Sequence, residues 1–344
     1  MSPSLRRVIL VAGFVVVLMG ASALSGAAPA RANVGALSAP PVYLPLIVGG
    51  TPVVAGCPVL PSDNIWNRAV DTLPVDANSA TYISAIGATT HFHADFGSGT
   101  WDGFPIGIPY NVVGTGQTKS SVIFDWPDES DAGPYPIPAS PLIEGDPNGG
   151  GDRHLLIVDS STCKLYELYA AHKSGGKWYA GSGAIYDLNS NALRPDTWTS
   201  ADAAGLPMLP GLARYEEVAA GVIRHALRFT ANNSAAAYIW PARHQAPYNT
   251  KAGSPPMGQR FRLKASFNVA QFQPWPQAYV LAVAMQKYGL ILADNGSSWY
   301  VSGAPNSGWD NDVLHKLDVI QGSDFEAVNE SGLMVDPNSG QAKP

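Results

Sequence analysis

Strict alternation of side-chain type between Ile223 and Thr230 is the feature that most constrains how this chain can fold. Apolar residues and one histidine take every second position, namely Ile223, His225, Leu227 and Phe229. Arg224 and Arg228 stand at positions between them. Because successive side chains of a strand point to opposite faces, this pattern predicts a half-buried strand with a basic outer face.

The same alternation recurs in Gln259–Phe267, where Arg260, Arg262 and Lys264 share one face. Between such segments the chain is interrupted by 35 Gly and 29 Pro, more than average usage of about 7% and 5%. Short strands, frequent turns and few helices predict a mainly β fold. We expect a single β-sandwich or jelly-roll-like domain with one or two short helices.

Two local patterns add detail to this expectation. The helix indicated most clearly is Pro276–Tyr288, since Pro276 suits the first turn of a helix and Gly289 its end. The segments Leu290–Ala293 and Trp299–Ser302 flank Asn295-Gly296, a dipeptide that favours tight hairpin turns. The sequence therefore predicts a hairpin there.

Residues 1–32 have the features of a signal peptide. Arg6 and Arg7 precede the apolar run Val8–Gly20, and Ala30-Arg31-Ala32 matches an A-x-A cleavage site. An uncleaved anchor is the alternative, but a run of about a dozen apolar residues is short for a membrane span. We expect a secreted, extracellular protein with no stable membrane span after cleavage. Residues 33–56 are interpreted as an Ala/Pro-rich linker, residues 57–330 as one β-rich globular domain, and residues 331–344 as a polar tail.

Cysteine count and charge narrow the compartment and the partners. In an exported chain, the pair Cys57 and Cys163 predicts one disulfide, with two buried thiols as the alternative. The formal net charge is −6 and becomes more negative once the signal peptide is removed. Because nucleic acid requires a basic footprint, this charge argues against a nucleic-acid partner.

The two basic strand faces are the first candidate site. If the two strands are neighbours in one sheet, their cations line one face, and arginine pairs well with carboxylate or sulfate. This predicts a groove for an acidic or partly acidic glycan. The substrate-binding candidates are Arg224, Arg228, Arg262 and Lys264, together with Trp198 and His244. Alternatively, these cations form a solvated face or pair with the acidic loop between Trp126 and Asp152.

Ionisable residues near strands are the second candidate site. Asp152-Arg153-His154 follows three glycines, and His154 could act as a general acid or base. A capping or salt-bridge cluster is the alternative for these three residues. Glycosidases use a pair of carboxylates. Several carboxylates of this sequence lie near the expected strands. The catalytic candidates are Asp152, His154, Glu167, Asp202 and His225, and further carboxylates near strands are Asp187, Glu216 and Asp294.

A third candidate is the segment His91–Asp95. On a strand, its H-x-H-x-D spacing would place His91, His93 and Asp95 on one face, which suits a divalent metal. No third histidine is near in sequence, although His154, His225 or His244 could complete the site in space. The alternative is that the segment is a loop. A divalent metal is the only cofactor that the sequence suggests.

Several short segments together resemble a set of exported bacterial and fungal proteins of unassigned function. The segments are Asp152-Arg153-His154, Leu165-Tyr166-Glu167, Ser182-Gly183-Ala184, Ser200–Arg214, Pro241–His244, Met257-Gly258 and Asp294-Asn295-Gly296. The resemblance covers residues 63–328 and implies export and a single domain. It implies no catalytic residue.

These features favour a secreted protein that acts on a polysaccharide or oligosaccharide, as a glycoside hydrolase or lyase. Tryptophans near polar loop residues could stack on sugars, although core packing is their usual role. A non-catalytic carbohydrate-binding or cell-surface structural protein explains the aromatics and cations equally well. A metal-dependent hydrolase is the second alternative. Nothing in the sequence matches the common motifs of serine hydrolases, phosphate loops, zinc proteases or dinucleotide-binding enzymes.

Overall fold

The structure is a computed structural model that describes residues 50–344, so the expected signal peptide and linker residues 33–49 lie outside the described residues. Strand exceeds helix, at 27% against 17%, which confirms a mainly β chain with a few short helices.

The strands are β1 (Val53–Val54), β2 (Cys57–Pro58), β3 (His93–Asp95), β4 (Thr100–Trp101), β5 (Phe104–Pro105), β6 (Tyr110–Val113), β7 (Val122–Phe124), β8 (Leu155–Asp159), β9 (Lys164–Leu168), β10 (His172–Ser174), β11 (Lys177–Ala180), β12 (Gly183–Asp187), β13 (Leu227–Ala231), β14 (Arg260–Leu263), β15 (Leu290–Asn295), β16 (Tyr300–Ser302) and β17 (Phe325–Ala327). The α-helices are α1 (Ser79–Ile86), α2 (Tyr215–Ala219), α3 (Pro276–Lys287) and α4 (Asn311–Leu314). Short 3₁₀ helices are η1 (Ile65–Asn67), η2 (Pro127–Glu129), η3 (Leu209–Gly211), η4 (Val269–Phe272), η5 (His315–Val319) and η6 (Gly322–Asp324).

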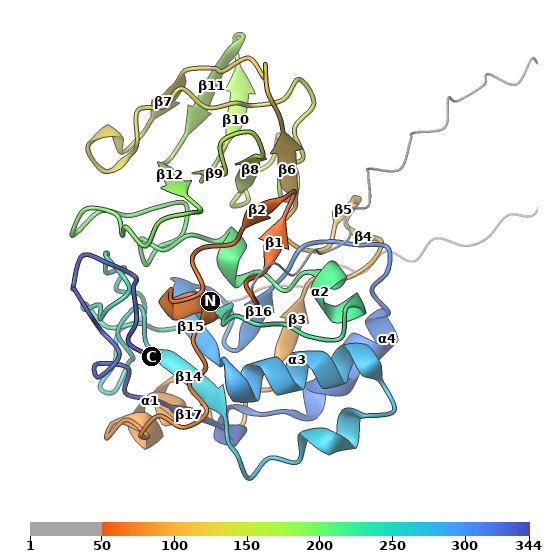
Figure 1. The fold of residues 1–344 in the computed structure, drawn as a ribbon, viewed down its shortest axis with the longest axis vertical. Coiled ribbons are helices and arrows are strands. Elements are labelled where there is room, and N and C mark those ends of the chain that lie inside the picture. Colours follow the sequence, from red (N-terminus) through yellow and green to blue (C-terminus); the bar gives the residue numbers. More distant parts are fainter. Residues whose placement is uncertain (1–49) are drawn as a thin grey trace, which may run out of the picture. The chain divides into compact units, whose positions relative to one another are not determined.

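The largest sheet has six strands in the order β17-β14-β15-β13-β16-β3. It is mixed, because β13 runs parallel to β15 but antiparallel to β16. The helix α3 packs against β14 in the lower part of the view in Figure 1. A four-stranded sheet, β12-β9-β8-β6, and a three-stranded sheet, β10-β11-β7, lie above it in that view. All five residues of β8 are buried, so this strand is covered on both faces.

Aromatic packing fixes the centre of the six-stranded sheet. The fully buried Trp299 lies between Phe229, with ring centroids 5.4 Å apart, and Phe325, 4.9 Å away. Phe261 meets Trp299 edge-on at 5.7 Å. Such pairs contribute about 0.5–1.5 kcal/mol beyond the area that they bury. These contacts tie β13, β14 and β17 to the segment that leads into β16.

The predicted helix at Pro276 is confirmed, but the predicted hairpin is wrong. The two segments on either side of Asn295-Gly296 form β15 and β16, and β13 lies between them in the sheet. Strand β13 pairs with both, so the chain after β15 must cross β13 before it forms β16. A strand distant in sequence therefore takes the place that a local hairpin partner would occupy.

The predicted basic face is also wrong. Strands β13 and β14 belong to one sheet, but β15 separates them, and residues 223–226 are irregular rather than strand. Arg228, Arg260 and Arg262 are buried instead of facing solvent. Because buried charges must be paired, these guanidinium groups bond to carboxylates and backbone carbonyls inside the protein.

Each remaining cation of that prediction has a structural position. Arg262 pairs with Glu326 at 2.9 Å, and Arg260 lies 3.2 Å from the buried Glu330. Lys264 donates to the carbonyl oxygen of Ser323 at 2.7 Å. Arg224 is exposed on the irregular segment before β13. The expected groove for an acidic glycan is therefore absent from this sheet.

The disulfide prediction is confirmed. Cys57 and Cys163 are bonded, with Cα atoms 5.3 Å apart and a sequence separation of 106. The flanking segments are packed rather than loose. Val53–Val54, at the end of the expected linker, pairs with β2. In the expected tail, Gln341 forms a bridge with Asn64 and Ala342 is buried.

Within residues 50–344, no helix combines the length and apolar character needed to cross a bilayer.

Candidate functional site

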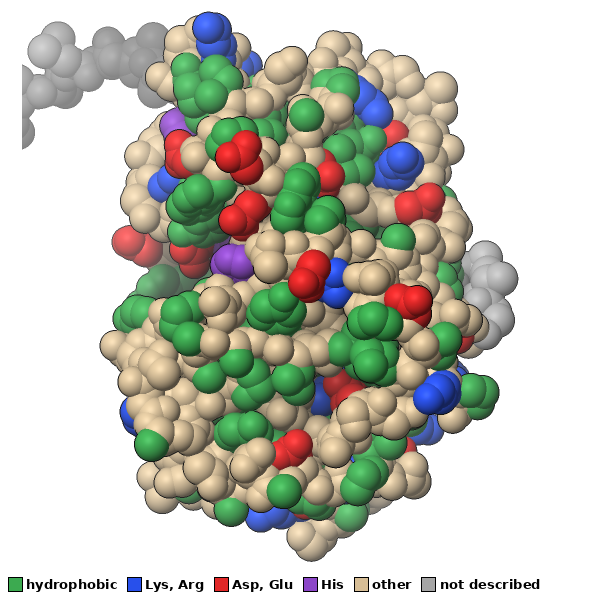
Figure 2. All heavy atoms as spheres, turned by 90° about the vertical axis from the view of Figure 1, so that its left-hand side faces the viewer, with side chains coloured by type: hydrophobic (Ala, Val, Ile, Leu, Met, Phe, Trp, Pro, Cys, Tyr) green, Lys and Arg blue, Asp and Glu red, His purple; other side chains and the backbone are tan. Residues whose placement is uncertain are grey.

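A pocket of about 420 Å³ lies at the carboxyl end of β15. Its walls come from segments that are far apart in sequence. The lining residues are Trp126, Glu129, Asp152, Tyr169, Ser182, Thr199, Ser200, Ala201, Asp202, Ala203, His244, Ala246, Asp294 and Asn295. The face drawn in Figure 2 shows acidic, hydrophobic and histidine side chains close together in its upper half, while Lys and Arg side chains lie singly.

The loop that forms one wall is held by Ser200. The Ser200 hydroxyl accepts from the amide of Asp202, and its single proton is shared between the carbonyl oxygens of Asp202, at 2.8 Å, and Leu206, at 2.7 Å. Gly205 has a φ of +70°, and a Cβ there would lie 2.5 Å from the carbonyl oxygen of Trp198. Only glycine fits this close approach of two backbone segments. The wall is therefore rigid, as the Leu-Pro pairs in this loop indicate.

Glu167 anchors the same loop from β9. Its carboxyl group is fully buried and accepts hydrogen bonds from the amides of Met208 and Leu209, each at 3.0 Å. These amides stand at the start of η3, where backbone N–H groups have no partner within the helix. Burial raises the pKa of Glu167 to about 7, although the two amides act in the opposite direction. Glu167 thus holds the loop and does not reach the pocket.

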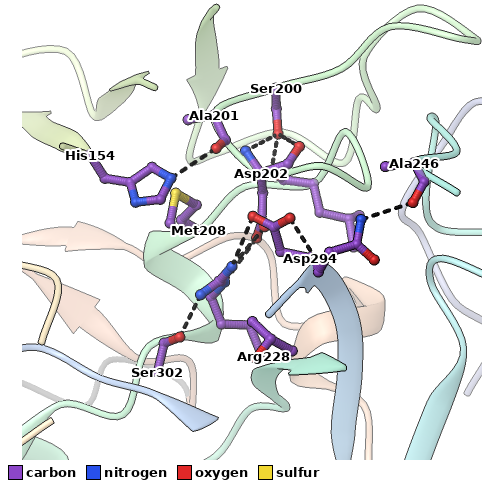
Figure 3. A network of polar contacts seen from close by, with 12 residues as sticks. His154, Ser200, Ala201, Asp202, Met208, Arg228, Ala246, Asp294 and Ser302 are labelled. Carbon is purple, nitrogen blue, oxygen red and sulfur yellow. Dashed lines mark hydrogen bonds and ion pairs between the residues drawn. The ribbon is translucent and has the colours of Figure 1, made fainter. Parts of the chain in front are cut away.

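Asp202 and Arg228 form a bidentate ion pair next to Asp294, as Figure 3 shows. Nε of Arg228 donates to Oδ2 of Asp202 at 2.8 Å and Nη2 donates to Oδ1 at 2.7 Å. Nη1 of the same guanidinium donates to the hydroxyl of Ser302. Both charged side chains are almost wholly removed from solvent, at 3% and 0% exposure. The positive charge of Arg228 is therefore balanced by Asp202 inside the protein.

Asp294 is the carboxyl group that connects this pair to the pocket. It follows the buried part of β15, its side chain is 24% exposed, and Oδ2 lies 3.8 Å from Nη2 of Arg228. Desolvation raises the pKa of Asp294 to about 8, and the negative charge of Asp202 adds to this effect against the attraction of Arg228. A carboxyl group with this pKa holds a proton at neutral pH and can donate it.

His154 lies behind the wall and does not line the pocket. Its Nδ1 donates to Oε2 of Glu144 at 2.5 Å, and its Nε2 donates to the carbonyl oxygen of Ala201 at 3.1 Å. Burial lowers the pKa of His154, but the adjacent Glu144 carboxylate outweighs burial and raises this pKa to about 9. His154 is therefore a buried imidazolium that supports the Ala201 segment (Figure 3). Its predicted role as a general acid or base is not supported.

An aromatic pair forms another wall. Trp126 is 52% exposed and stacks on Tyr169, with ring centroids 6.3 Å apart and an interplanar angle of 18°. Gly181 packs beneath both rings, because a Cβ at this position would lie 2.8 Å from each. Burial raises the pKa of the Tyr169 hydroxyl, and the carboxylates Asp152 and Asp294 raise it further. Both carboxyl groups line the same pocket as Tyr169.

His244 and Glu129 face each other on the pocket wall. Nδ1 of His244 donates to the carbonyl oxygen of Ala203 at 2.8 Å, which leaves Nε2 facing the pocket, 3.9 Å from Oε2 of Glu129. Glu129 accepts a hydrogen bond from the amide of Thr199 at 3.1 Å. Asp152, another carboxylate of the lining, is exposed. Of the predicted site residues, the structure brings Asp152, Asp202 and His244 together here.

Two other predicted site residues belong to different surroundings. His225 is fully buried, and its Nε2 lies 3.0 Å from both Glu217 and Arg214. This cluster supports α2 and does not line the pocket. Trp198 is half-buried, with the guanidinium carbon of Arg194 5.5 Å from the ring centroid, and it also lies outside the lining. The predictions of a catalytic His225 and a sugar-binding Trp198 are therefore not supported.

The predicted metal set does not converge. Strand β3 begins at His93, while Nδ1 of His91 lies 2.6 Å from the carbonyl oxygen of Asp318. The His93 ring packs against Tyr300 at 4.3 Å instead of pointing to a shared centre. Within the described part of the chain, no three His, Cys, Asp or Glu side chains are arranged to hold a metal ion.

Few of the pocket residues carry a signal in the sequence that sets them apart. Asp294 was one of several carboxylates near strands, and Glu129 and Trp126 belonged to a long acidic loop. The signal that could have distinguished Asp294 is its place at the end of an apolar strand, immediately before Asn295-Gly296. Polar groups at strand ends are common positions for binding and catalysis, whereas nothing local indicates that the acidic loop reaches this strand end.

No protein-family model, curated protein or solved structure matches this chain. The resemblance to exported proteins of unassigned function therefore stays a prediction, and the function must be argued from the pocket itself.

Proposed function

We propose that this chain is an exported glycan-active enzyme of the glycoside hydrolase type, with Asp294 as its proton donor. The observation that carries the proposal is the position of this carboxyl group. Asp294 lies partly exposed in a pocket that also contains an aromatic pair and a second, exposed carboxylate. Glycosidases combine a protonated and an ionised carboxyl group around the scissile bond in this way.

The surroundings of Asp294 suit the role of general acid. Burial and the adjacent Asp202 favour the protonated form, so the proton is available at neutral pH. In the proposed step, Asp294 gives this proton to the glycosidic oxygen as the bond from that oxygen to the anomeric carbon breaks. Asp202 and Arg228 act through Asp294 and are positioning residues, because their own charges are paired with each other.

Asp152 is the proposed second carboxylate. It lines the same pocket as Asp294 and Tyr169. In the proposed reaction it takes a proton from the attacking water, whose oxygen forms the new bond to the anomeric carbon. The Trp126–Tyr169 pair offers an exposed ring face on which a sugar can stack.

Export is part of this proposal. The disulfide between Cys57 and Cys163 suits an oxidising compartment. The segment that carries the expected signal peptide lies outside the described residues. A polymer outside the cell is a natural substrate for an exported enzyme with an open pocket. Extracellular localisation is tested directly by finding the processed chain in the culture medium.

A uronate lyase and a metal-dependent hydrolase are not supported. The first needs cations that face the substrate, and among the described residues no Lys or Arg lines this pocket. The second needs converging ligands, and the histidines of the predicted metal set do not converge. A non-catalytic glycan-binding protein is the second candidate, because the exposed face of Trp126 would serve a binder equally well.

The test is a screen of the mature protein against neutral, amino and acidic polysaccharides, with release of reducing ends as the readout. We expect turnover on at least one glycan, and Asp294→Asn should abolish it while leaving glycan retention intact. Asp187→Asn, an exposed carboxylate at the end of β12, is the matched control and should keep full activity. Retention on a glycan without any turnover by the wild-type protein would favour the binding protein instead.

A further inference from the structure

The charge of the pocket narrows the class of glycan that fits it. The aromatic pair and the cavity define the site, and four acidic side chains are among the residues that line it. Glu129 and Asp152 are carboxylates with no ion pair closer than 3.9 Å among the described residues. The lining holds two further acidic side chains: Asp202 is paired with Arg228, and Asp294 is the proposed proton donor. The pocket therefore presents unbalanced negative charge to whatever enters it.

The cations near the pocket are turned away from it. Arg228 does not line the pocket and is bonded to Asp202 and Ser302. The guanidinium of Arg153, next to the pocket residue Asp152, donates to the carbonyl oxygens of Gly149 and Ala170. A glycan that carries carboxylate or sulfate would meet like charge here without a counterion, which disfavours its binding.

Trp126 and Glu129 stand on one turn of the chain and both line the pocket. Trp126 precedes η2, and Glu129 is its last residue. An exposed indole face attracts a cation through its ring quadrupole, and a carboxylate beside it adds a charge-assisted hydrogen bond. Primary ammonium is a ligand that suits both groups at once. His244, 3.9 Å from Glu129, has Nε2 free to bond a sugar hydroxyl.

We infer that the substrate is an amino glycan, a polymer in which sugar units carry free ammonium groups, and that Trp126 and Glu129 recognise one of these groups. This inference rests on the proposed function, because it assigns a substrate class to the same pocket. It replaces the acidic glycan that the basic strand faces suggested, since those cations are buried.

The experiment measures binding of four oligosaccharides of equal length by calorimetry, in the Asp294→Asn protein so that none is consumed. They are a glucosamine oligomer, its N-acetylated form, a cello-oligosaccharide and an oligogalacturonate. At a pH that protonates the amines, the glucosamine oligomer should bind at least about tenfold more tightly than the N-acetylated form, a difference of about 1.4 kcal/mol. Salt should reduce this preference.

Glu129→Gln should remove most of the preference and leave affinity for the N-acetylated oligomer unchanged. Asp128→Asn, which removes the same charge one residue away and outside the lining, should leave the preference intact. Equal binding of the amino and N-acetylated forms, or tighter binding of the galacturonate, would overturn the inference.

The two proposals fail separately. Cleavage of an N-acetylated or unsubstituted glycan by the wild-type enzyme, without preference for the amine, would keep the hydrolase and reject the amino glycan. Selective retention of the glucosamine oligomer without cleavage would reject the hydrolase and keep the recognition of ammonium.

Discussion

Arg228 holds Asp202 through two parallel hydrogen bonds, 2.8 Å and 2.7 Å long, and so places a buried negative charge close to Asp294. The ion pair is almost wholly removed from solvent, yet it influences the protonation of the more exposed Asp294. Asp202 favours the proton on Asp294, whereas Arg228 opposes it. Burial of Asp294 is the largest cause of its raised pKa, and the balance between Asp202 and Arg228 adjusts that pKa.

Replacing Asp202 with Asn should lower the pKa of Asp294, because it removes a negative charge and leaves Arg228 free to attract the Asp294 carboxylate. The alkaline limb of the kcat profile should therefore move to lower pH. Breaking one side of a buried ion pair also costs about 3–5 kcal/mol of folding stability, so the profile is measured at low temperature.

Ser302→Ala is the control for that variant. It removes a hydrogen-bond partner of Arg228 without changing any charge. Its alkaline limb should stay at the wild-type position. If Asp202→Asn kept the wild-type profile as well, Asp202 would have no part in setting the acid.

Asp294→Asn should make the protein more stable at alkaline pH. The pKa of Asp294 is raised in the folded state from an ordinary value of 3.8 to about 8. The folded form therefore binds the proton more tightly, and stability declines as pH rises from about 4 to 8. Above this window the variant should gain at least about 1 kcal/mol, or roughly 2 °C in Tm.

The gain of Asp294→Asn should shrink toward zero below about pH 4, where both folded and unfolded wild-type chains are protonated at this position. Thermal unfolding across the pH range, monitored by circular dichroism, measures the difference. Asp128→Asn serves as the exposed control and should show no such dependence. A variant that is less stable than wild type at alkaline pH would contradict the raised pKa.

Glu144→Gln should destabilise the protein by about 3 kcal/mol, since it leaves the buried His154 imidazolium without its counterion. The folded pKa of His154 is raised and that of Glu144 is lowered. The contribution of His154 is complete below its ordinary value of 6.5 and disappears as pH rises through about 9. The contribution of Glu144 is complete above its ordinary value of 4.5 and is lost as pH falls.

The cost of Glu144→Gln should thus be greatest between about pH 4.5 and 6.5 and smaller on either side. Urea unfolding at several pH values measures it. Glu326→Gln, which breaks the ion pair with Arg262, is the matched control, and its cost should not decline as pH rises through 9. A cost of Glu144→Gln that stayed constant to alkaline pH would show that His154 is neutral.

Loss of the disulfide should lower the free energy of unfolding, because the unfolded chain gains conformational entropy when the bond is absent. The bond closes a loop of 106 residues, for which the chain-entropy estimate is about 4–5 kcal/mol. The Cys57→Ala, Cys163→Ala double variant should therefore unfold at a markedly lower temperature, and a reductant should have the same effect on the wild-type protein. An unchanged Tm under both treatments would contradict this expectation.

Local patterns in the sequence predicted the kind of fold but not how its parts meet. The helix that begins at Pro276 and the pairing of Cys57 with Cys163 depend on local geometry or on parity, and both are confirmed. The predicted hairpin after Leu290 is wrong because β13 lies between β15 and β16 in the sheet. The residues of a turn do not indicate that a distant strand will pair between the two strands they connect. Arg228 alternated as expected, yet β13 is buried along most of its length, so Arg228 became a buried partner of Asp202.

The candidate site was accessible from sequence only in part. Asp152, Asp202 and His244 were identified from their neighbours in the chain and do gather at the pocket. His154 and His225 are buried in ion pairs with Glu144 and Glu217, and alternation cannot distinguish a buried pair from an open site. The pocket itself arises where the acidic loop meets the end of β15, which is a tertiary contact.

The most direct test of this account is the protonation state of Asp294 in the folded protein. Side-chain carboxyl ¹³C shifts of aspartate report it without any substrate, and the Asp294→Asn variant identifies the resonance by its loss. We predict a titration midpoint at about 8. A midpoint near the ordinary value of 3.8 would mean that Asp294 is ionised at neutral pH, and the proposed acid would be excluded.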